Sequence, residues 1–260
     1  MRILAICLLL VTAAAAEDRI PPALTGVGID QKLNGQVPLD LTFRDETGRT
    51  VRLGDYFGRR PVILSLVYYE CPMMCTLVLN GLVHTMREIP FTAGDQFDVV
   101  TVSFNPRDTP ALAAAKKRTY LKSYGRAGAG KGWHFLTGDQ ASIQALTGAA
   151  GFRYAYDPVT QQYAHATTIM VLTPEGRLSR YFFGIEYPAR DVRLSLVEAS
   201  GNKIGSPVDQ LLLFCYHYDP VAGKYGFAIM NAMRAAGVAT ALALGLLVFI
   251  LFRRERHASR

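Results

Sequence analysis

Residues 61–75, PVILSLVYYECPMMC, decide the fold. Pro61 to Tyr68 is an almost unbroken apolar run rich in Val, Ile and Leu, which is typical of a strand buried on both faces of a sheet. Cys71 and Cys75 follow almost at once, and a helical pattern continues to about Glu88. The stretch therefore predicts a central strand that leads into a helix, with both cysteines at the junction.

Strands and helices alternate on either side of this stretch. An extended arm over residues 17–38 leads to a domain predicted over residues 39–204, which opens with a short hairpin at Leu39 to Val51. Further strands are expected at Phe97–Phe104, His134–Leu136, Thr167–Thr173 and Leu178–Phe183, and helices at Asp108–Tyr124, Asp139–Ala149 and Asp191–Ala199. This order predicts an α/β fold, a mixed sheet with helices on both faces.

The beginning of the chain is typical of a secretory signal peptide. Residues 1–16 combine one arginine with an apolar run and a small-residue motif, so cleavage is expected after Ala16. A lipoprotein anchor at Cys7 is the less favoured interpretation, because almost no hydrophobic run precedes that residue. The body of the protein is therefore predicted to leave the cytoplasm.

The end of the chain predicts a membrane anchor. A membrane-proximal segment over residues 205–225 precedes residues 226–252, whose last 18 positions are uncharged and largely apolar. The arginine-rich tail 253–260 marks the cytoplasmic side. We expect a single-pass protein of a bacterial-type inner membrane, with its main domain in the periplasm or outside the cell and its C-terminus in the cytoplasm.

Composition excludes several classes of protein. Half of the 260 residues are apolar and 19% are charged, which excludes a disordered or collagen-like chain. The formal net charge of +7 includes Arg2 and a net +3 from the tail, which leaves +3 for residues 17–252. No basic stripe with interleaved aromatic residues is visible, so nucleic acid is not an expected partner.

The cysteines are the first candidates for chemistry. Removal of the signal peptide leaves Cys71, Cys75 and Cys215, an odd number in an oxidising compartment. A thiol where a strand feeds a helix is favoured as thiolate by the positive end of the helix dipole, and thiolate is both nucleophile and metal ligand. Four-residue spacing lets Cys71 and Cys75 share an ion or form a disulfide, and a purely structural disulfide is the alternative.

His165 is a candidate third ligand. It stands just before the predicted strand at Thr167, in the sequence YAHATT. Because monovalent copper prefers thiolates and accepts imidazole, Cys71, Cys75 and His165 would make a three-coordinate copper site. Taken alone, His165 would more simply be an ordinary hydrogen-bonded histidine.

Three motifs in order, YYECPMMC, VSFNPRDTP and YAHATTIMVLTPEGRLSRYFFG, resemble the Sco/SenC family of membrane-tethered, thioredoxin-like copper chaperones. The resemblance covers roughly Gln36 to Ser200 and implies a thioredoxin-like fold. It also implies that Cys71, Cys75 and His165 bind copper, as Cu(I) or Cu(II). The implied partner is the copper-bearing subunit of a respiratory cytochrome c oxidase, or another periplasmic copper or thiol protein, to which the chain delivers copper or whose thiols it keeps reduced.

The chain departs from that family at three points. Asn105 stands before Pro106 where an aspartate is usual, and Ala164 precedes the histidine where an aspartate is frequent. Both changes remove negative charge near the expected site. The anchor also follows the domain instead of preceding it.

Other signals leave alternatives open. Cys215 and His217 form a Cys-x-His pair that is either an auxiliary copper site or an incidental part of a membrane-proximal segment. A metallochaperone is the first hypothesis for function, and a thiol-disulfide oxidoreductase or redox sensor that uses Cys71 and Cys75 is the second. A peroxide-reducing enzyme is a weaker third, because no pattern around a single peroxidatic cysteine is evident.

Overall fold

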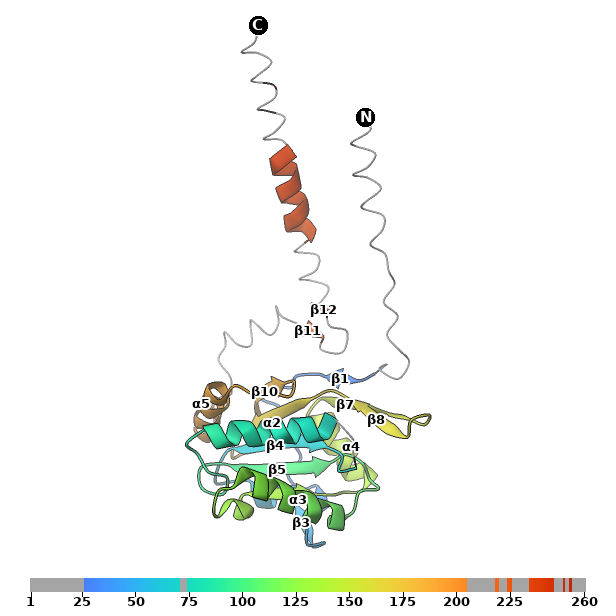
Figure 1. Cartoon of the computed structure of the whole chain (residues 1–260), viewed down its shortest axis with the longest axis vertical. Helices are drawn as coiled ribbons and strands as arrows, with labels where there is room; N and C mark the ends of the chain where they lie inside the picture. The colour runs from blue at the N-terminus through green and yellow to red at the C-terminus, as the bar shows by residue number, and fades with distance from the viewer. Residues whose placement is uncertain are drawn as a thin grey trace.

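The structure is a computed structural model that describes residues 26–70, 74–204, 218–219, 224–225, 234–245, 250 and 253. Residues 26–204 form the body of the molecule (Figure 1). The predicted signal peptide, residues 1–16, lies outside the described residues, as do most of the predicted membrane-proximal segment and parts of the predicted span.

A five-stranded mixed sheet forms the centre of the body. Its strand order is β10-β9-β4-β5-β6. The strands are β4 (Val62–Val67), β5 (Asp98–Ser103), β6 (Trp133–Leu136), β9 (Thr168–Leu172) and β10 (Leu178–Phe183). Strands β4, β5 and β6 are parallel, whereas β9 runs antiparallel to β4 and to β10. Every residue of β4 is buried, which confirms the central strand predicted from its apolar run.

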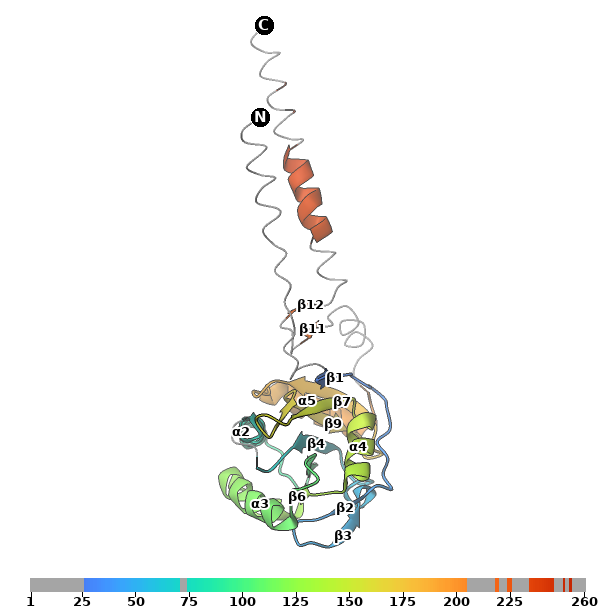
Figure 2. The same cartoon turned by 90° about the vertical axis from the view of Figure 1, so that its right-hand side faces the viewer.

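Helices cover both faces of this sheet. Figure 2 shows α2 (Met74–Glu88) and α3 (Pro110–Tyr124) on one side and α4 (Gln140–Ala149) on the other. The last helix of the body, α5 (Ala189–Ser200), packs against α2, β9 and β10. Thr109 caps α3 and Asp139 caps α4 through their side chains. The predicted mixed α/β fold with helices on both faces is confirmed.

Short strands complete the body. The predicted hairpin is β2 (Thr42–Arg44) paired with β3 (Thr50–Arg52). A second sheet, which the sequence patterns did not predict, joins β1 (Gly28–Ile29), β7 (Phe152–Asp157) and β8 (Gln162–His165). The body also contains the short 3-10 helices η3 (Leu53–Tyr56) and η4 (Ala129–Lys131). Beyond the body, β11 (Tyr218–Asp219) pairs with β12 (Lys224–Tyr225). The β7–β8 hairpin extends from the side of the body (Figure 1).

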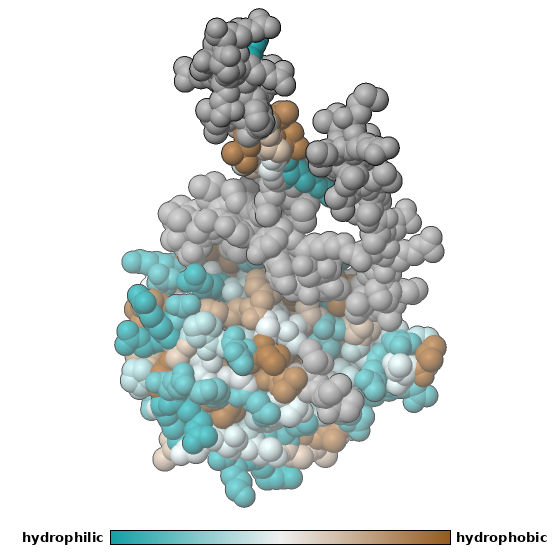
Figure 3. Space-filling view, turned by 45° about the horizontal axis from the view of Figure 1, so that its top comes forward, coloured by the Kyte–Doolittle hydropathy of each residue, from teal (hydrophilic) through white to brown (hydrophobic). Residues whose placement is uncertain are grey.

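Residues 234–245 are helical and exposed. The side chains of Val238, Leu242 and Leu244 are 60%, 69% and 57% exposed. The surface of the body, in contrast, mixes hydrophilic and hydrophobic side chains (Figure 3). Within the part of the chain that the structure describes, no helix is both long and apolar enough to cross a membrane. Residues 246–249 of the predicted span lie outside that part.

Candidate metal centre

The topology of the sheet brings the predicted site segments to one edge. The carboxyl ends of β4 and β5 lie together because these strands are parallel, with Val67 opposite Ser103. Ser65 of β4 pairs with Ile169 of the antiparallel β9, so the beginning of β9 lies at the same edge. The segment that leads to the cysteines, the turn after β5 and the segment around His165 therefore meet there.

The cysteine segment connects β4 to α2. Strand β4 ends at Val67 and α2 begins at Met74, so the backbone of Cys75 lies in the first turn of the helix. Unsatisfied N–H groups and the helix dipole favour a thiolate at such a position. Cys71 and the side chain of Cys75 lie outside the described residues.

His165 is the last residue of β8 and lies over the carboxyl ends of β4 and β5. Its ring centroid is 5.1 Å from that of Phe104 and 5.9 Å from that of Tyr68, which is three residues before Cys71. The His165 Nδ1 atom is 2.9 Å from the carbonyl oxygen of Ala166. This contact assigns the proton of the neutral imidazole to Nδ1 and the lone pair to Nε2, the arrangement that a metal-binding histidine commonly has.

A buried carboxylate, that of Asp108, is hydrogen-bonded to the backbone that leads to the cysteines. Asp108 is 6% exposed, and its Oδ2 accepts hydrogen bonds from the backbone N–H of Tyr69 and from the Ser103 hydroxyl, both at 2.6 Å. Burial raises the pKa of Asp108, the hydrogen bonds from Ser103 and Tyr69 oppose that shift, and the negative charge of Glu70 adds to it. Asp108 thus fixes the backbone two residues before Cys71. In the sequence, Asp108 lies at the start of a predicted helix and within the motif VSFNPRDTP, and neither feature indicates its bond to Tyr69.

Asn105 connects Asp108 to the β7–β8 hairpin. Its side-chain Nδ2 donates to Asp108 Oδ1 at 3.0 Å, and its Oδ1 accepts from the backbone N–H of Arg107 at 3.1 Å and from the Tyr163 hydroxyl at 3.4 Å. The Arg107 guanidinium lies 5.3 Å from the centroid of the Tyr156 ring. Two residues of the turn therefore contact the hairpin that ends at His165.

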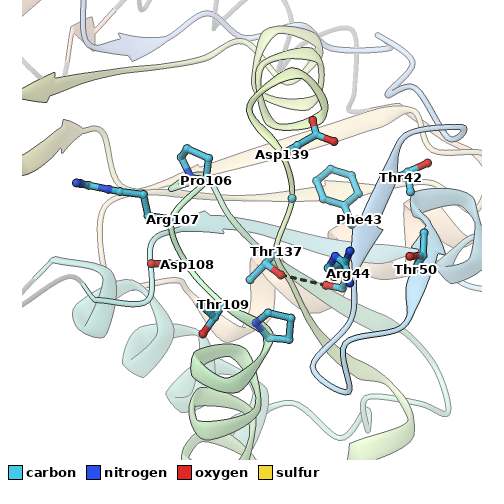
Figure 4. Close-up of a pocket in the computed structure, with 12 residues that line it drawn as sticks. Thr42, Phe43, Arg44, Thr50, Pro106, Arg107, Asp108, Thr109, Thr137 and Asp139 are labelled. Carbon is cyan, nitrogen blue, oxygen red and sulfur yellow. Dashed lines mark hydrogen bonds between the residues drawn. The ribbon is translucent and has the colours of Figure 1, made fainter.

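An open pocket of about 470 Å³ lies beside the same turn (Figure 4). Its lining residues come from β2, β3, the turn after β5 and the loop after β6: Thr42, Phe43, Arg44, Thr50, Pro106, Arg107, Asp108, Thr109, Pro110, Thr137, Gly138 and Asp139. In Figure 4 the side chain of Arg107 points away from the other labelled residues. His165 is not among these lining residues.

The remaining histidines of the body have structural contacts. His84 is exposed on α2 and lies 3.4 Å from the Glu88 carboxylate. His134 packs on Tyr56 with ring centroids 4.3 Å apart, and burial, helped by the charge of Lys117, lowers its pKa to about 4. Among the described residues, no group of three His, Cys, Asp or Glu side chains could hold a metal ion. Cys215 and His217, the predicted auxiliary pair, lie outside them.

The comparison with family profiles decides the family. The profile described as SCO1/SenC matches residues 30–196, which is more than half of the chain. The chain belongs to the SCO1/SenC family. Comparison with curated proteins finds no match.

Solved structures extend this result. A protein from Aquifex aeolicus VF5, named as a candidate for electron transfer, is 29% identical, with a TM-score of 0.57, over 65% of this chain and 95% of its own. A second Aquifex aeolicus VF5 protein, named for electron transport, is 27% identical, with a TM-score of 0.53, over 65% of this chain and 99% of its own. BsSco is described as a member of the Sco family of cytochrome c oxidase assembly proteins, and a disulfide switch was identified in it. It is 19% identical, with a TM-score of 0.52, over 67% of this chain and 99% of its own. Its likeness confirms the thioredoxin-like fold.

The structure places two of the three departures of this SCO1/SenC chain, the residues at positions 105 and 164. Asn105 is buried, with 3% of its surface exposed, and its amide is bonded to Asp108. Ala164 lies on β8, opposite Ala155 of β7. Asn105 thus belongs to the turn beneath the cysteine segment, whereas Ala164 belongs to the hairpin.

Proposed function

We propose that this chain is a copper-binding metallochaperone in which Cys71, Cys75 and His165 hold one copper ion for transfer to an acceptor. The observation that carries the proposal is the position of His165, at the strand edge where β4 leads into the cysteine segment. Two thiolates and one imidazole suit Cu(I), and a disulfide between Cys71 and Cys75 would prevent binding, so the redox state of the pair controls loading.

The residues around His165 support its role as a ligand. Tyr68 and Phe104 pack against the ring, and the contact from Nδ1 to the Ala166 carbonyl fixes the tautomer. A ring held in this way presents Nε2 to an ion without a change of tautomer. In transfer, ligands of the acceptor replace those of the chaperone, and His165 is exchanged more readily than the thiolates.

The acceptor in this proposal is the copper-bearing subunit of a respiratory cytochrome c oxidase, or another periplasmic copper or thiol protein. BsSco, a member of the same family, is described as an oxidase assembly protein, which supports this destination. The apolar residues 226–252 and the arginine-rich tail support a C-terminal span with the body in the periplasm or outside the cell. Accessibility of residues 253–260 to protease in sealed inverted membrane vesicles, but not in intact spheroplasts, tests this orientation.

The decisive experiment measures Cu(I) binding. The full chain is purified in mild detergent, reduced, and titrated anaerobically against a chromophoric Cu(I) chelator, beside His165→Ala and Cys71→Ser. We expect one copper per chain, with affinity reduced about tenfold or more in both variants. His84→Ala is the matched control, because His84 is exposed on α2 and bonded only to Glu88 among its described contacts. Binding that is unaffected by His165→Ala would contradict the three-ligand site.

A second candidate function is thiol-disulfide exchange by Cys71 and Cys75. It is supported by the backbone of Cys75 in the first turn of α2, where a thiolate is favoured, and by the relatives named for electron transfer. In that reaction one thiolate attacks a partner disulfide and the other resolves the mixed disulfide, so that the partner is reduced and the pair oxidised. Reduction of a model disulfide that is indifferent to His165→Ala, together with weak copper binding, would favour this function.

A further inference from the structure

Residues 103–108, the end of β5 and the turn that follows it, contact both segments that would supply ligands to copper. On one side, the Asp108 carboxylate holds the backbone N–H of Tyr69 at 2.6 Å, two residues before Cys71. On the other side, Asn105 accepts from Tyr163 at 3.4 Å, and Arg107 stacks on Tyr156, both on the hairpin that ends at His165. The turn therefore lies between the cysteine segment and the histidine hairpin.

The polar groups of the turn are hydrogen-bonded to one another. The Asn105 amide donates to Asp108 at 3.0 Å, and the Ser103 hydroxyl donates to Asp108 at 2.6 Å. Within the described residues, no buried side-chain nitrogen or oxygen lacks a hydrogen-bond partner. A displacement of Asn105 would therefore break bonds on both sides of the turn.

We infer that residues 103–108 act as a clamp that sets the distance between His165 and the cysteine segment, with Asn105, Arg107 and Asp108 as positioning residues. This inference rests on the proposed copper site. A ligand set drawn from two separate segments binds an ion well only if those segments are held at the correct separation. Groups that orient ligands without touching the metal commonly change metal affinity by about 10- to 100-fold.

The hairpin side of the clamp can be weakened without disturbing the core. Arg107 is exposed, so Arg107→Ala removes its stacking on Tyr156 without opening a cavity. Tyr163→Phe removes one hydroxyl and retains the ring, which packs on Phe104. Two variants serve as matched controls. Arg153→Ala removes an exposed ion pair with Asp30 from the same hairpin, and Tyr187→Phe removes a hydroxyl that donates to the Gly184 carbonyl in the loop after β10.

The test is a double-mutant cycle on Cu(I) affinity, measured by chelator competition with the full chain. Arg107→Ala with Tyr163→Phe should weaken binding about tenfold when His165 is present, and by no more than about twofold in the His165→Ala background. The control variants should stay within about twofold of the parent. An equal loss with and without His165 would overturn the clamp, because the effect would then not pass through the histidine.

A second measurement needs no metal. Amide hydrogen exchange of residues 152–165 in the metal-free full chain should become about tenfold faster in the Arg107→Ala, Tyr163→Phe variant and remain unchanged in Tyr187→Phe. If His165→Ala leaves copper affinity unchanged, the proposed copper site fails, and this exchange measurement alone decides whether the turn holds the hairpin. If His165→Ala weakens binding but the clamp variants change neither affinity nor exchange, only the clamp is overturned.

Discussion

Replacement of Gly81 by alanine should destabilise the body of the protein, although alanine is the better helix former. Gly81 lies in α2, and a Cβ atom there would be 1.8 Å from the carbonyl oxygen of Ile185 and 2.9 Å from its carbonyl carbon. Because an ordinary carbon–oxygen contact is near ~3.3 Å, the Ile185 backbone must retreat by roughly 1.5 Å. The adjacent hydrogen bond from the Thr85 hydroxyl to the Tyr187 carbonyl, 2.7 Å long and buried, opposes that movement.

These contributions give the expected magnitude. Overpacking costs about 1–3 kcal/mol, and strain or loss of the Thr85 hydrogen bond adds about 1 kcal/mol. The higher helix propensity of alanine recovers about 1 kcal/mol. The free energy of unfolding should therefore fall by about 2 kcal/mol. The same loop follows β10, which pairs with β9, so its displacement should also disturb the strand next to β4.

Urea unfolding, followed by the fluorescence of Trp133, measures this change. Trp133 is the single tryptophan and is fully buried, so its emission reports on the core. Gly148→Ala is the matched control, because Gly148 is an exposed glycine near the end of α4, and no atom lies within 4 Å of the position that a Cβ atom would take there. We expect Gly148→Ala to raise stability by about 0.5 kcal/mol. The reasoning is refuted if both substitutions change stability in the same direction.

Three further predictions concern stability. Acidification from about pH 6.5 to about pH 4 should lower the free energy of unfolding by about 3 kcal/mol. Burial holds the pKa of His134 in the folded protein near 4, so only the unfolded chain takes up the proton in that window. In His134→Phe, the free energy of unfolding measured in urea should depend less on pH over this range. Arg126→Met should lower the free energy of unfolding by about 2 kcal/mol. The Arg126 guanidinium donates to the carbonyls of Arg87 and Ile89, at 3.0 and 2.6 Å, at the end of α2, and methionine cannot replace these bonds. An unchanged urea midpoint would contradict this prediction. Asn105→Asp should destabilise the protein at pH 7 by about 2 kcal/mol, because the new carboxylate repels that of Asp108. At pH 5 the loss of stability, measured against the parent at the same pH, should be smaller. Equal losses at both pH values would argue against charge repulsion.

The parts of the fold that the sequence predicts are those set by local patterns. The burial of β4 follows from an apolar run that needs no knowledge of its neighbours. Thr109 and Asp139 cap helices because a short polar side chain reaches the N–H three residues ahead, a contact that sequence spacing alone defines. The burial of β4 and the positions of these helix starts can therefore be predicted from the sequence alone.

The β7–β8 hairpin could not be predicted in this way. Its first strand, FRYAYD, is only partly buried and lacks a clear alternation of apolar and polar residues. Its turn contains no glycine or asparagine, and Gln161 adopts the left-handed conformation with φ 56°. The hairpin is instead stabilised by tertiary contacts between its tyrosines and the turn after β5, and these depend on residues about 50 positions away.

The same limit applies to Asn105. In the sequence, asparagine in place of aspartate indicates a loss of negative charge near the copper site. In the structure, the Asp108 carboxylate lies beneath the cysteine segment, and the Asn105 amide donates a hydrogen bond to it. A second carboxylate at position 105 would lose this donor and, unless one of the pair took up a proton, would place two negative charges side by side. The Asn105 Nδ2 atom therefore stabilises the negative charge of Asp108, and the same hydrogen bond connects the two residues of the clamp. The contribution of position 105 to the site is better described by hydrogen bonding than by net charge.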